Sequence, residues 1–371
     1  MKIGLLSYHN SVNYGAVLQI YALKKTLEKL GADVSVIDYK AINSEYEFSL
    51  DNVIRHIGLS RALVKYLYYH TFAKKLINAK KRKFTEFINV NFNLTRSFNS
   101  TDEFGSGNNY DIVICGSDQI WNPEITNGFD RMMFCDFYST KTQKFSYAAS
   151  VGDVKIIDTE EKRKEFFKLL KNFNSIAVRE KELADFISQN SKINTLVTLD
   201  PTLLLNASEY TPIKDAPKSI DRYILVYQLA RYPRSMEVAH LLAKEKNLKI
   251  IEIINNPYVL LRDKSMLFSA SPLEFLNLVQ NAEYVITNSF HGTIFSIIFK
   301  KDFYTVASRT RNSRITNLLT TLNLTNRLLY EDSEILPRNS IDYDKVGVLL
   351  EKEREISLNY LKDIVNKRKN E

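Results

Sequence analysis

Residues 283–299 read Glu-Tyr-Val-Ile-Thr-Asn-Ser-Phe-His-Gly-Thr-Ile-Phe-Ser-Ile-Ile-Phe, and this stretch decides the fold class. Its first part, Glu283 to Thr287, has the apolar and β-branched side chains of a buried strand. Small and polar residues follow, and the apolar run from Ile294 to Phe299 predicts a buried helix. A buried strand that turns directly into a helix indicates a parallel α/β layout, in which ligands bind at the carboxyl ends of the strands.

His291 lies in this turn, beside Ser289, Gly292 and Thr293. Together they offer a protonatable imidazole, two hydroxyls and backbone N–H groups near a helix N-terminus, which are the parts of an anion-handling acid/base site. A histidine that only fills a core does not need polar neighbours and a glycine at a strand end. We therefore interpret His291 as a functional residue.

The alternation of strand-like and helical patterns predicts parallel sheets in both halves of the chain. Residues from about 50 to 95 have continuous helical periodicity instead, and a polar, proline-containing stretch from Asn206 to Arg222 predicts a linker. The predicted fold is α/β, with two Rossmann-like domains in a GT-B-like arrangement. We place the N-terminal domain at 1–205, with a helical insertion at about 50–95. The C-terminal domain follows at 206–340, with Phe303 to Val306 as its last strand, and a C-terminal helix at 341–371.

The composition limits the classes of partner. The formal charge is +8, and much of the excess lies in one run after several tyrosines: Lys74, Lys75, Lys80, Lys81, Arg82 and Lys83. Such a run is typical of a solvated helix face, and contact with an anionic membrane or a lipid-diphosphate carrier is the alternative. Nucleic acid is the least favoured of the possible partners, so we expect none.

Several chemistries and locations lack support in the sequence. Metal-binding and dinucleotide-binding motifs are absent, so we expect neither a metal nor a cofactor. Cys115 and Cys135 are expected to be reduced and buried. No apolar run reaches the roughly 18 residues that span a membrane. A cytoplasmic location is expected, with peripheral contact at the inner membrane face left open.

Two further loops carry candidate binding residues. Asn13-Tyr14-Gly15 follows the first predicted strand, and its glycine would let backbone approach a ligand. Ser117-Asp118-Gln119 follows another strand and precedes Trp121, the only tryptophan. Each has a plainer alternative: a turn at a helix start for the first loop, an N-cap role for Asp118, and a core position for Trp121.

Six segments together resemble the polysaccharide pyruvyl transferase family, in that family's order and over residues 1 to about 330. They are Asn13-Tyr14-Gly15-Ala16-Val17-Leu18-Gln19, Gly116-Ser117-Asp118-Gln119-Ile120-Trp121-Asn122, Tyr147-Ala148-Ala149-Ser150-Val151-Gly152, Val178-Arg179-Glu180, Asp200-Pro201-Thr202 and Ser289-Phe290-His291-Gly292. The resemblance implies a GT-B-like fold, phosphoenolpyruvate as donor, and a saccharide acceptor. That acceptor is often a polyprenyl-diphosphate-linked unit at the cytoplasmic membrane face.

One departure from the family pattern concerns the donor site. Family members with a characterised donor site often have an arginine two residues before the histidine, where this chain has Ser289. An arginine from a neighbouring loop could supply the charge, and we select Arg314 and Arg231 over Arg309 and Arg311.

The resulting hypothesis is pyruvyl transfer from phosphoenolpyruvate to a pair of saccharide hydroxyls, forming a pyruvate ketal on a cell-surface polysaccharide precursor such as capsule or exopolysaccharide. His291 is the expected proton donor, because an imidazole starts near neutral pKa, and Asp118 is expected to accept a hydroxyl proton. The other predicted donor-binding residues are Ser289, Gly292, Thr293, Arg231 and Arg314; the acceptor-binding residues are Asn13, Tyr14, Gly15, Ser117, Gln119 and Trp121. The alternatives are a glycosyltransferase that uses a nucleotide sugar and a non-catalytic, membrane-associated assembly protein.

Overall fold

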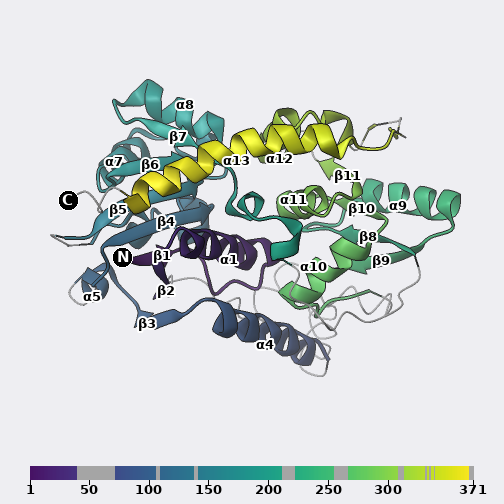
Figure 1. Ribbon diagram of the computed structural model, residues 1–371, viewed down its shortest axis with the longest axis horizontal. Helices are drawn as coiled ribbons and strands as arrows, with labels where there is room; N and C mark the ends of the chain where they lie inside the picture. Colours follow the sequence, from purple (N-terminus) through teal and green to yellow (C-terminus); the bar gives the residue numbers. More distant parts are fainter. Residues whose placement is uncertain are drawn as a thin grey trace, which may run out of the picture.

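A computed structural model describes residues 1–39, 72–105, 109–137, 141–210, 222–254, 266–307, 313–330, 332–333, 336–337 and 339–366. Within these residues the chain forms two α/β domains, each built on a parallel sheet (Figure 1). The predicted fold class is confirmed: two Rossmann-like domains in a GT-B-like arrangement. The first part of the predicted helical insertion and residues 367–371 lie outside the described residues.

The first sheet has seven described strands in the order β3-β2-β1-β4-β5-β6-β7. They are β1 (Lys2–Leu6), β2 (Asp33–Tyr39), β3 (Leu94–Phe98), β4 (Ile112–Asp118), β5 (Gln143–Ala149), β6 (Ser175–Val178) and β7 (Thr195–Val197). The direction of strand addition reverses between β1 and β4, which pair in parallel. Loops at the carboxyl ends of strands beside such a reversal form the usual ligand crevice of doubly wound sheets.

The second sheet has five described strands in the order β12-β11-β10-β8-β9. They are β8 (Tyr223–Tyr227), β9 (Lys249–Ile253), β10 (Tyr284–Thr287), β11 (Asp302–Ala307) and β12 (Leu328–Tyr330). The prediction that the last strand is Phe303 to Val306 was wrong, because β12 pairs in parallel with β11. The reversal in this sheet falls between β8 and β10, so the turn after β10 that carries His291 lies at the switch point.

Helices pack around both sheets. In the first domain they are α1 (Tyr14–Lys29), α4 (Lys74–Asn91), α5 (Thr101–Gly105), α6 (Pro123–Thr126), α7 (Glu160–Leu170) and α8 (Lys181–Asn190). In the second they are α9 (Pro233–Lys246), α10 (Pro272–Asn281), α11 (Phe290–Ile298) and α12 (Ser313–Thr321). Helix α1 begins where the Asn13 side chain accepts hydrogen bonds from the backbone N–H groups of Gly15 and Ala16, at 2.9 and 3.3 Å.

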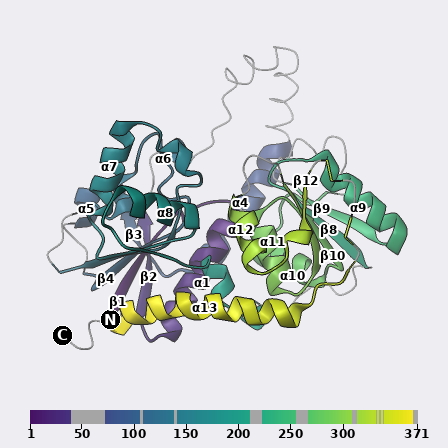
Figure 2. The same cartoon turned by 90° about the horizontal axis from the view of Figure 1, so that it is seen from above.

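The last helix, α13 (Tyr343–Asn366), spans both domains (Figure 2). Near its start, the Tyr343 hydroxyl donates to the carbonyl of Ser296 in the C-terminal domain at 3.4 Å. Near its end, the Tyr360 hydroxyl donates to the carbonyl of Ser146 on β5 at 2.9 Å. The sequence left open which domain this helix would cover, and it joins the two.

Helix α4 belongs to the helical insertion between β2 and β3. Its apolar side, which includes Phe84 and Phe87, is buried. Lys83 forms an ion pair with Glu274 of α10, 2.7 Å away, so this helix also contacts the second domain. Four other cations of the basic run are exposed: Lys74, Lys75, Lys81 and Arg82. No helix in the described part of the chain is both long and apolar enough to cross a membrane.

Candidate active site

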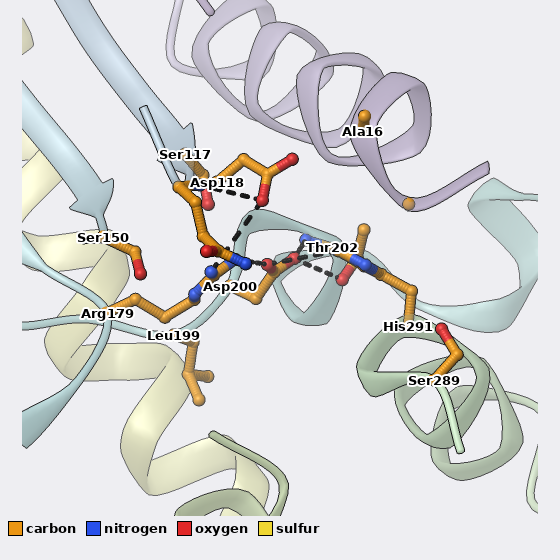
Figure 3. Close-up of polar contacts among 12 residues, drawn as sticks. Ala16, Ser117, Asp118, Ser150, Arg179, Leu199, Asp200, Thr202, Ser289 and His291 are labelled. Carbon is orange, nitrogen blue, oxygen red and sulfur yellow. Dashed lines mark hydrogen bonds and ion pairs between the residues drawn. The ribbon is translucent and has the colours of Figure 1, made fainter. Parts of the chain in front are cut away.

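Four polar side chains from the carboxyl ends of strands in both domains meet at the seam between the domains. Asp118 ends β4, Arg179 follows β6, Asp200 follows β7, and His291 follows β10. Figure 3 shows them in a row across the seam, with His291 approaching from the C-terminal domain. The seam therefore joins charged groups that lie far apart in the sequence.

Arg179 is the centre of a buried ion-pair network. Its Nη1 donates to Asp200 Oδ2 at 3.1 Å, its Nε donates to Glu180 Oε1 at 3.0 Å, and its Nη2 lies 4.0 Å from Asp118 Oδ1. Burial acts to lower the pKa of Arg179, but the carboxylates of Glu180, Asp200 and Asp118 together raise it above its ordinary value. Nη2 is buried and makes no hydrogen bond to any described residue, so this donor remains for a ligand.

Asp200 links the arginine to the histidine. Its Oδ1 accepts hydrogen bonds from the backbone N–H and the hydroxyl of Thr202, at 3.1 and 2.6 Å. Its Oδ2 lies 3.4 Å from His291 Nε2. Burial acts to raise the pKa of Asp200, but His291 and Arg179 outweigh it and hold that pKa well below its usual range. An ionised carboxylate therefore faces the imidazole.

His291 lies in the first turn of α11. The helix was expected to begin at Ile294, but it begins at Phe290, because Ser289 caps it by accepting from the backbone N–H of Gly292 at 3.3 Å. The side chain is 11% exposed, and Nε2 makes no hydrogen bond to any described residue although it faces Asp200 at 3.4 Å. The histidine is thus held on a helix terminus with an unsatisfied nitrogen at the seam.

The backbone of Gly15 lies directly against this imidazole. A Cβ atom added at Gly15 would overlap His291 Nδ1 and Cγ. Because Gly15 opens α1 of the first domain, its missing side chain lets the histidine of the second domain approach the helix backbone. The sequence predicted that this glycine lets backbone approach a ligand; in the structure the group that approaches it is His291, and the role in acceptor binding stays a prediction.

Asp118 lies on the opposite side of Arg179 from His291. Its backbone has a φ of 80°, which is unfavourable for a residue with a side chain, and its Oδ1 accepts from the backbone N–H of Gln119 at 2.8 Å. The side chain is 23% exposed, more than Arg179 or Asp200. Asp118 is therefore the member of the row most open to an incoming hydroxyl.

Arg314 on α12 reaches the same region, whereas Arg231 does not join it. The guanidinium carbon of Arg314 lies 5.6 Å from the ring centroid of Phe290, next to His291. Burial lowers the pKa of Arg314, and the positive charge of Arg179 lowers it further. Arg231 instead pairs with Glu252 of β9 at 3.4 Å and lines a separate pocket. Of the two arginines selected from the sequence, only Arg314 lies near the histidine.

Two of the predicted acceptor-binding residues are packing residues. Trp121 is 1% exposed, stacks on Phe134 at 5.1 Å, and donates to the carbonyl of Met133 at 2.9 Å. Tyr14 is also 1% exposed and stacks on Phe275 of the second domain at 4.5 Å. Their expected contact with an acceptor is corrected accordingly: Trp121 stabilises the first domain, and Tyr14 joins the domains.

The remaining predicted residues form the walls of the seam. Asn13 is exposed and caps α1, Ser117 is buried, and the Gln119 amide faces the guanidinium of Arg314. Thr293 is fully buried, and its hydroxyl donates to the carbonyl of Ser289 at 3.0 Å. A side chain at Gly292 would overlap the hydroxyl of Thr287. Gly292 and Thr293 therefore shape the start of α11 and offer no side chain to a donor.

The prediction missed the acidic and basic residues of the first domain that surround the histidine. Arg179 and Glu180 directly follow β6, and Asp200 follows β7. A charged residue at the carboxyl end of a parallel strand was a signal available in the sequence. No group of three or more His, Cys, Asp or Glu in the described residues is arranged to hold a metal ion.

Solved structures resemble the chain over nearly its whole length at low identity. MnaA from S. aureus with UDP is 14% identical, covers 99% of this chain and 96% of its own, and has a TM-score of 0.49. UDP-GlcNAc 2-epimerase from Methanocaldococcus jannaschii is 15% identical, with coverage of 97% and 93% and a TM-score of 0.48. The heptosyltransferase WaaC from E. coli with ADP is 12% identical, with coverage of 95% and 100% and a TM-score of 0.40. No curated protein matches the sequence.

Two Rossmann-like domains that meet at a charged seam define the class of two-domain, GT-B-like proteins. The family model for polysaccharide pyruvyl transferase matches residues 13–309, which is most of the chain. The chain therefore belongs to the polysaccharide pyruvyl transferase family, as its sequence motifs predicted.

Proposed function

We propose that the protein transfers the pyruvyl group of phosphoenolpyruvate to two hydroxyls of a saccharide, forming a cyclic ketal and releasing phosphate. The observation that carries the proposal is a pair of buried donors, Arg179 Nη2 and His291 Nε2. Neither makes a hydrogen bond to a described residue, and both lie next to Asp200 at the seam. Unsatisfied buried donors are costly unless a ligand accepts from them, and phosphoenolpyruvate brings a phosphate and a carboxylate.

The first step requires a proton donor. When His291 gives a proton to the terminal methylene carbon, a methyl group forms and positive charge develops at the carbon that carries the phosphate ester. The Asp200 carboxylate stabilises the imidazolium that precedes this step. Because the His291 side chain is only 11% exposed, the donor enters when the two domains separate along the seam.

The second step joins the acceptor. A saccharide hydroxyl attacks the cationic carbon and gives its proton to Asp118, the most exposed carboxylate of the row. The C–O bond to phosphate then breaks, and the second hydroxyl attacks the same carbon to close the ketal. One hydroxyl proton leaves with the phosphate, and the other restores the proton that His291 gave to the methyl group, so the enzyme returns to its starting state.

The acceptor in this proposal is a saccharide, and its polyprenyl-diphosphate-linked form would bring the enzyme to the cytoplasmic membrane face. The exposed cations of α4, such as Lys74 and Lys81, support contact with anionic lipid. Both points remain proposals, as does a cytoplasmic location.

The first test is donor choice. A thermal-shift comparison of phosphoenolpyruvate with UDP- and GDP-sugars separates pyruvyl transfer from glycosyl transfer, because a ligand at a hundredfold excess over its Kd stabilises by about 2.7 kcal/mol. We expect stabilisation by phosphoenolpyruvate alone. Stabilisation by a nucleotide sugar alone would overturn the proposal, and no response to either would favour the non-catalytic alternative.

The second test concerns Asp118. With a proven saccharide acceptor, Asp118→Asn should lower the rate of phosphate release by about 10²-fold or more, since a general base contributes at least that factor. Its affinity for phosphoenolpyruvate should stay close to that of the wild type. An unchanged rate in this variant would remove Asp118 from the mechanism.

A further inference from the structure

Phe290 is the first residue of α11, between the cap Ser289 and the histidine, and it contacts two arginines at once. The guanidinium carbon of Arg179 lies 5.2 Å from the ring centroid, and that of Arg314 lies 5.6 Å from it. The ring itself is 8% exposed. A guanidinium at this distance from an aromatic ring is attracted to the ring face, and more strongly where the site is desolvated.

The two arginines come from different domains and repel each other. Arg179 follows β6 of the first domain, whereas Arg314 lies on α12 of the second. Both guanidinium carbons lie within 5.6 Å of the same ring centroid, so the two cations are close, and the charge of Arg179 contributes to the lowered pKa of Arg314. The carboxylates of Glu180, Asp118 and Asp200 favour both cations, and the Phe290 ring adds a further attraction.

Arg314 also reaches across the seam. When the Gln119 amide is oriented with its oxygen toward the guanidinium, that oxygen accepts from Arg314 Nη2 at 3.2 Å and from Nη1 at 3.3 Å. Gln119 belongs to the first domain. Arg314 therefore contacts the first domain through the Gln119 amide and its own domain through the Phe290 ring. Arg179, in turn, has one donor, Nη2, that makes no hydrogen bond to any described residue and lies 4.0 Å from Asp118 Oδ1.

The same ring touches the proposed proton donor. The Phe290 and His291 rings meet edge to face, with centroids 5.4 Å apart and planes at 74°. One side chain thus contacts the imidazole and both guanidinium groups, and it does so from the N-terminal turn of α11.

We propose that Phe290 is a positioning residue that aligns Arg179 and Arg314 as a two-domain clamp for one anionic group. This proposal rests on the proposed function and adds to it the side chain, Phe290, that sets the spacing between the two guanidinium groups. An anion that accepts from both guanidinium groups would offset their repulsion and draw the domains together. Leucine at this position would keep the apolar volume but lose the aromatic face.

The experiment compares three variants. Phe290→Leu removes the ring, Phe290→Tyr keeps it, and Phe299→Leu makes the same change at the other end of α11, where the side chain is also 8% exposed. Binding of phosphoenolpyruvate and of inorganic phosphate is measured by calorimetry, alongside KM, kcat and Tm. We expect about tenfold weaker binding of both ligands and a raised KM for Phe290→Leu, with near wild-type values for the other two variants.

A double-mutant cycle distinguishes positioning from a structural role. If Phe290 acts through Arg314, Phe290→Leu should weaken binding far less in an Arg314→Gln background than in the wild type. Equal effects in both backgrounds, or a lowered Tm with unchanged affinity, would overturn the clamp. The proposed function can fail while the clamp proposal stands. This outcome would be a wild-type protein that binds inorganic phosphate, with affinity lowered by Phe290→Leu, but does not bind phosphoenolpyruvate. A wild type that binds neither removes both.

Discussion

One histidine in each domain, His9 and His291, follows a parallel strand, yet the two have different surroundings. Each follows the carboxyl end of a parallel strand, each is buried, and each faces an aspartate. His9 Nε2 lies 2.9 Å from Asp38 of its own domain, and burial lowers the pKa of His9 even though Asp38 opposes that shift. His291 faces Asp200 of the other domain.

The difference indicates that position at a strand end alone does not distinguish a histidine with a structural role from the proposed proton donor. His9 fixes the loop after β1 to the neighbouring strand β2, which is a structural role. His291 depends on the other domain for its aspartate and for the clearance at Gly15, so its environment exists only when the domains are together. The four predictions below test this contrast, beginning with the largest expected effect.

Alanine at each histidine should separate the two roles. His291→Ala should lower phosphate release by about 10²- to 10⁴-fold, the usual contribution of a general acid, with little change in the circular dichroism spectrum. His9→Ala should instead lower the free energy of unfolding by about 1 to 3 kcal/mol, because Asp38 loses its partner, while the folded protein keeps its turnover. Comparable losses of turnover in both variants would contradict the assignment of a structural role to His9 and a catalytic role to His291.

Gly15→Ala tests the clearance that His291 requires. The new methyl group overlaps the imidazole, and displacing a reacting group by about 1 Å can cost on the order of 10²-fold in rate. The matched control is Gly347→Ala on α13, where an added Cβ meets no atom within 4 Å. That substitution should leave the rate unchanged and stabilise its helix by up to about 1 kcal/mol. Wild-type turnover in Gly15→Ala would show that the close approach is irrelevant to catalysis.

Replacing Asp200 or Asp38 by asparagine compares how much each His–Asp pair contributes to the free energy of unfolding. Asp200 is fully buried and holds both Arg179 and His291, so Asp200→Asn should cost about 3 kcal/mol or more in urea unfolding. The Asp38 side chain is 21% exposed, and Asp38→Asn should cost about 1 kcal/mol. Equal costs for the two variants would contradict the view that the seam carries the stronger network.

The smallest effect is a pH dependence carried by His9. Its folded pKa lies below the unfolded value of about 6.5, so below that pH the unfolded chain binds a proton that the folded chain does not. Stability contributed by neutral His9 is therefore present above about pH 6.5 and falls as the pH drops, by at most about 1.4 kcal/mol per pH unit. His9→Gln should reduce the change of the urea unfolding midpoint with pH between pH 5 and 7. An unaltered pH dependence in this variant would show that other groups cause the effect.

The sequence predicted the parts of the fold that have long, regular patterns. The strand expected from Glu283 to Thr287 matches β10 to within one residue, because its apolar and β-branched side chains form a clear buried-strand pattern. The strand β12 was missed because its three residues, Leu328–Tyr330, are too short to show any alternation. The start of α11 was placed late because Phe290 and His291 were interpreted as loop residues, although Ser289 is a suitable cap.

The site was predictable only within one loop at a time. The sequence pointed to His291, Asp118 and Gly15, which the structure brings to one seam. It did not reveal that Asp200 faces His291, because the two residues are far apart in the chain and lie in different domains. Tyr14 and Trp121 were assigned to binding because they lie in polar loops that follow predicted strands, and no local pattern in these loops distinguishes ligand-contacting residues from packing residues.

Helix α13 has a consequence for the order of events during synthesis. The Ser357 hydroxyl accepts from the backbone N–H of Leu199, and the Tyr360 hydroxyl donates to the carbonyl of Ser146. These hydrogen bonds of the first domain cannot form until residues near 360 have been synthesised. A nascent chain still on the ribosome would therefore carry an amino-terminal half that lacks these bonds until translation has passed that point.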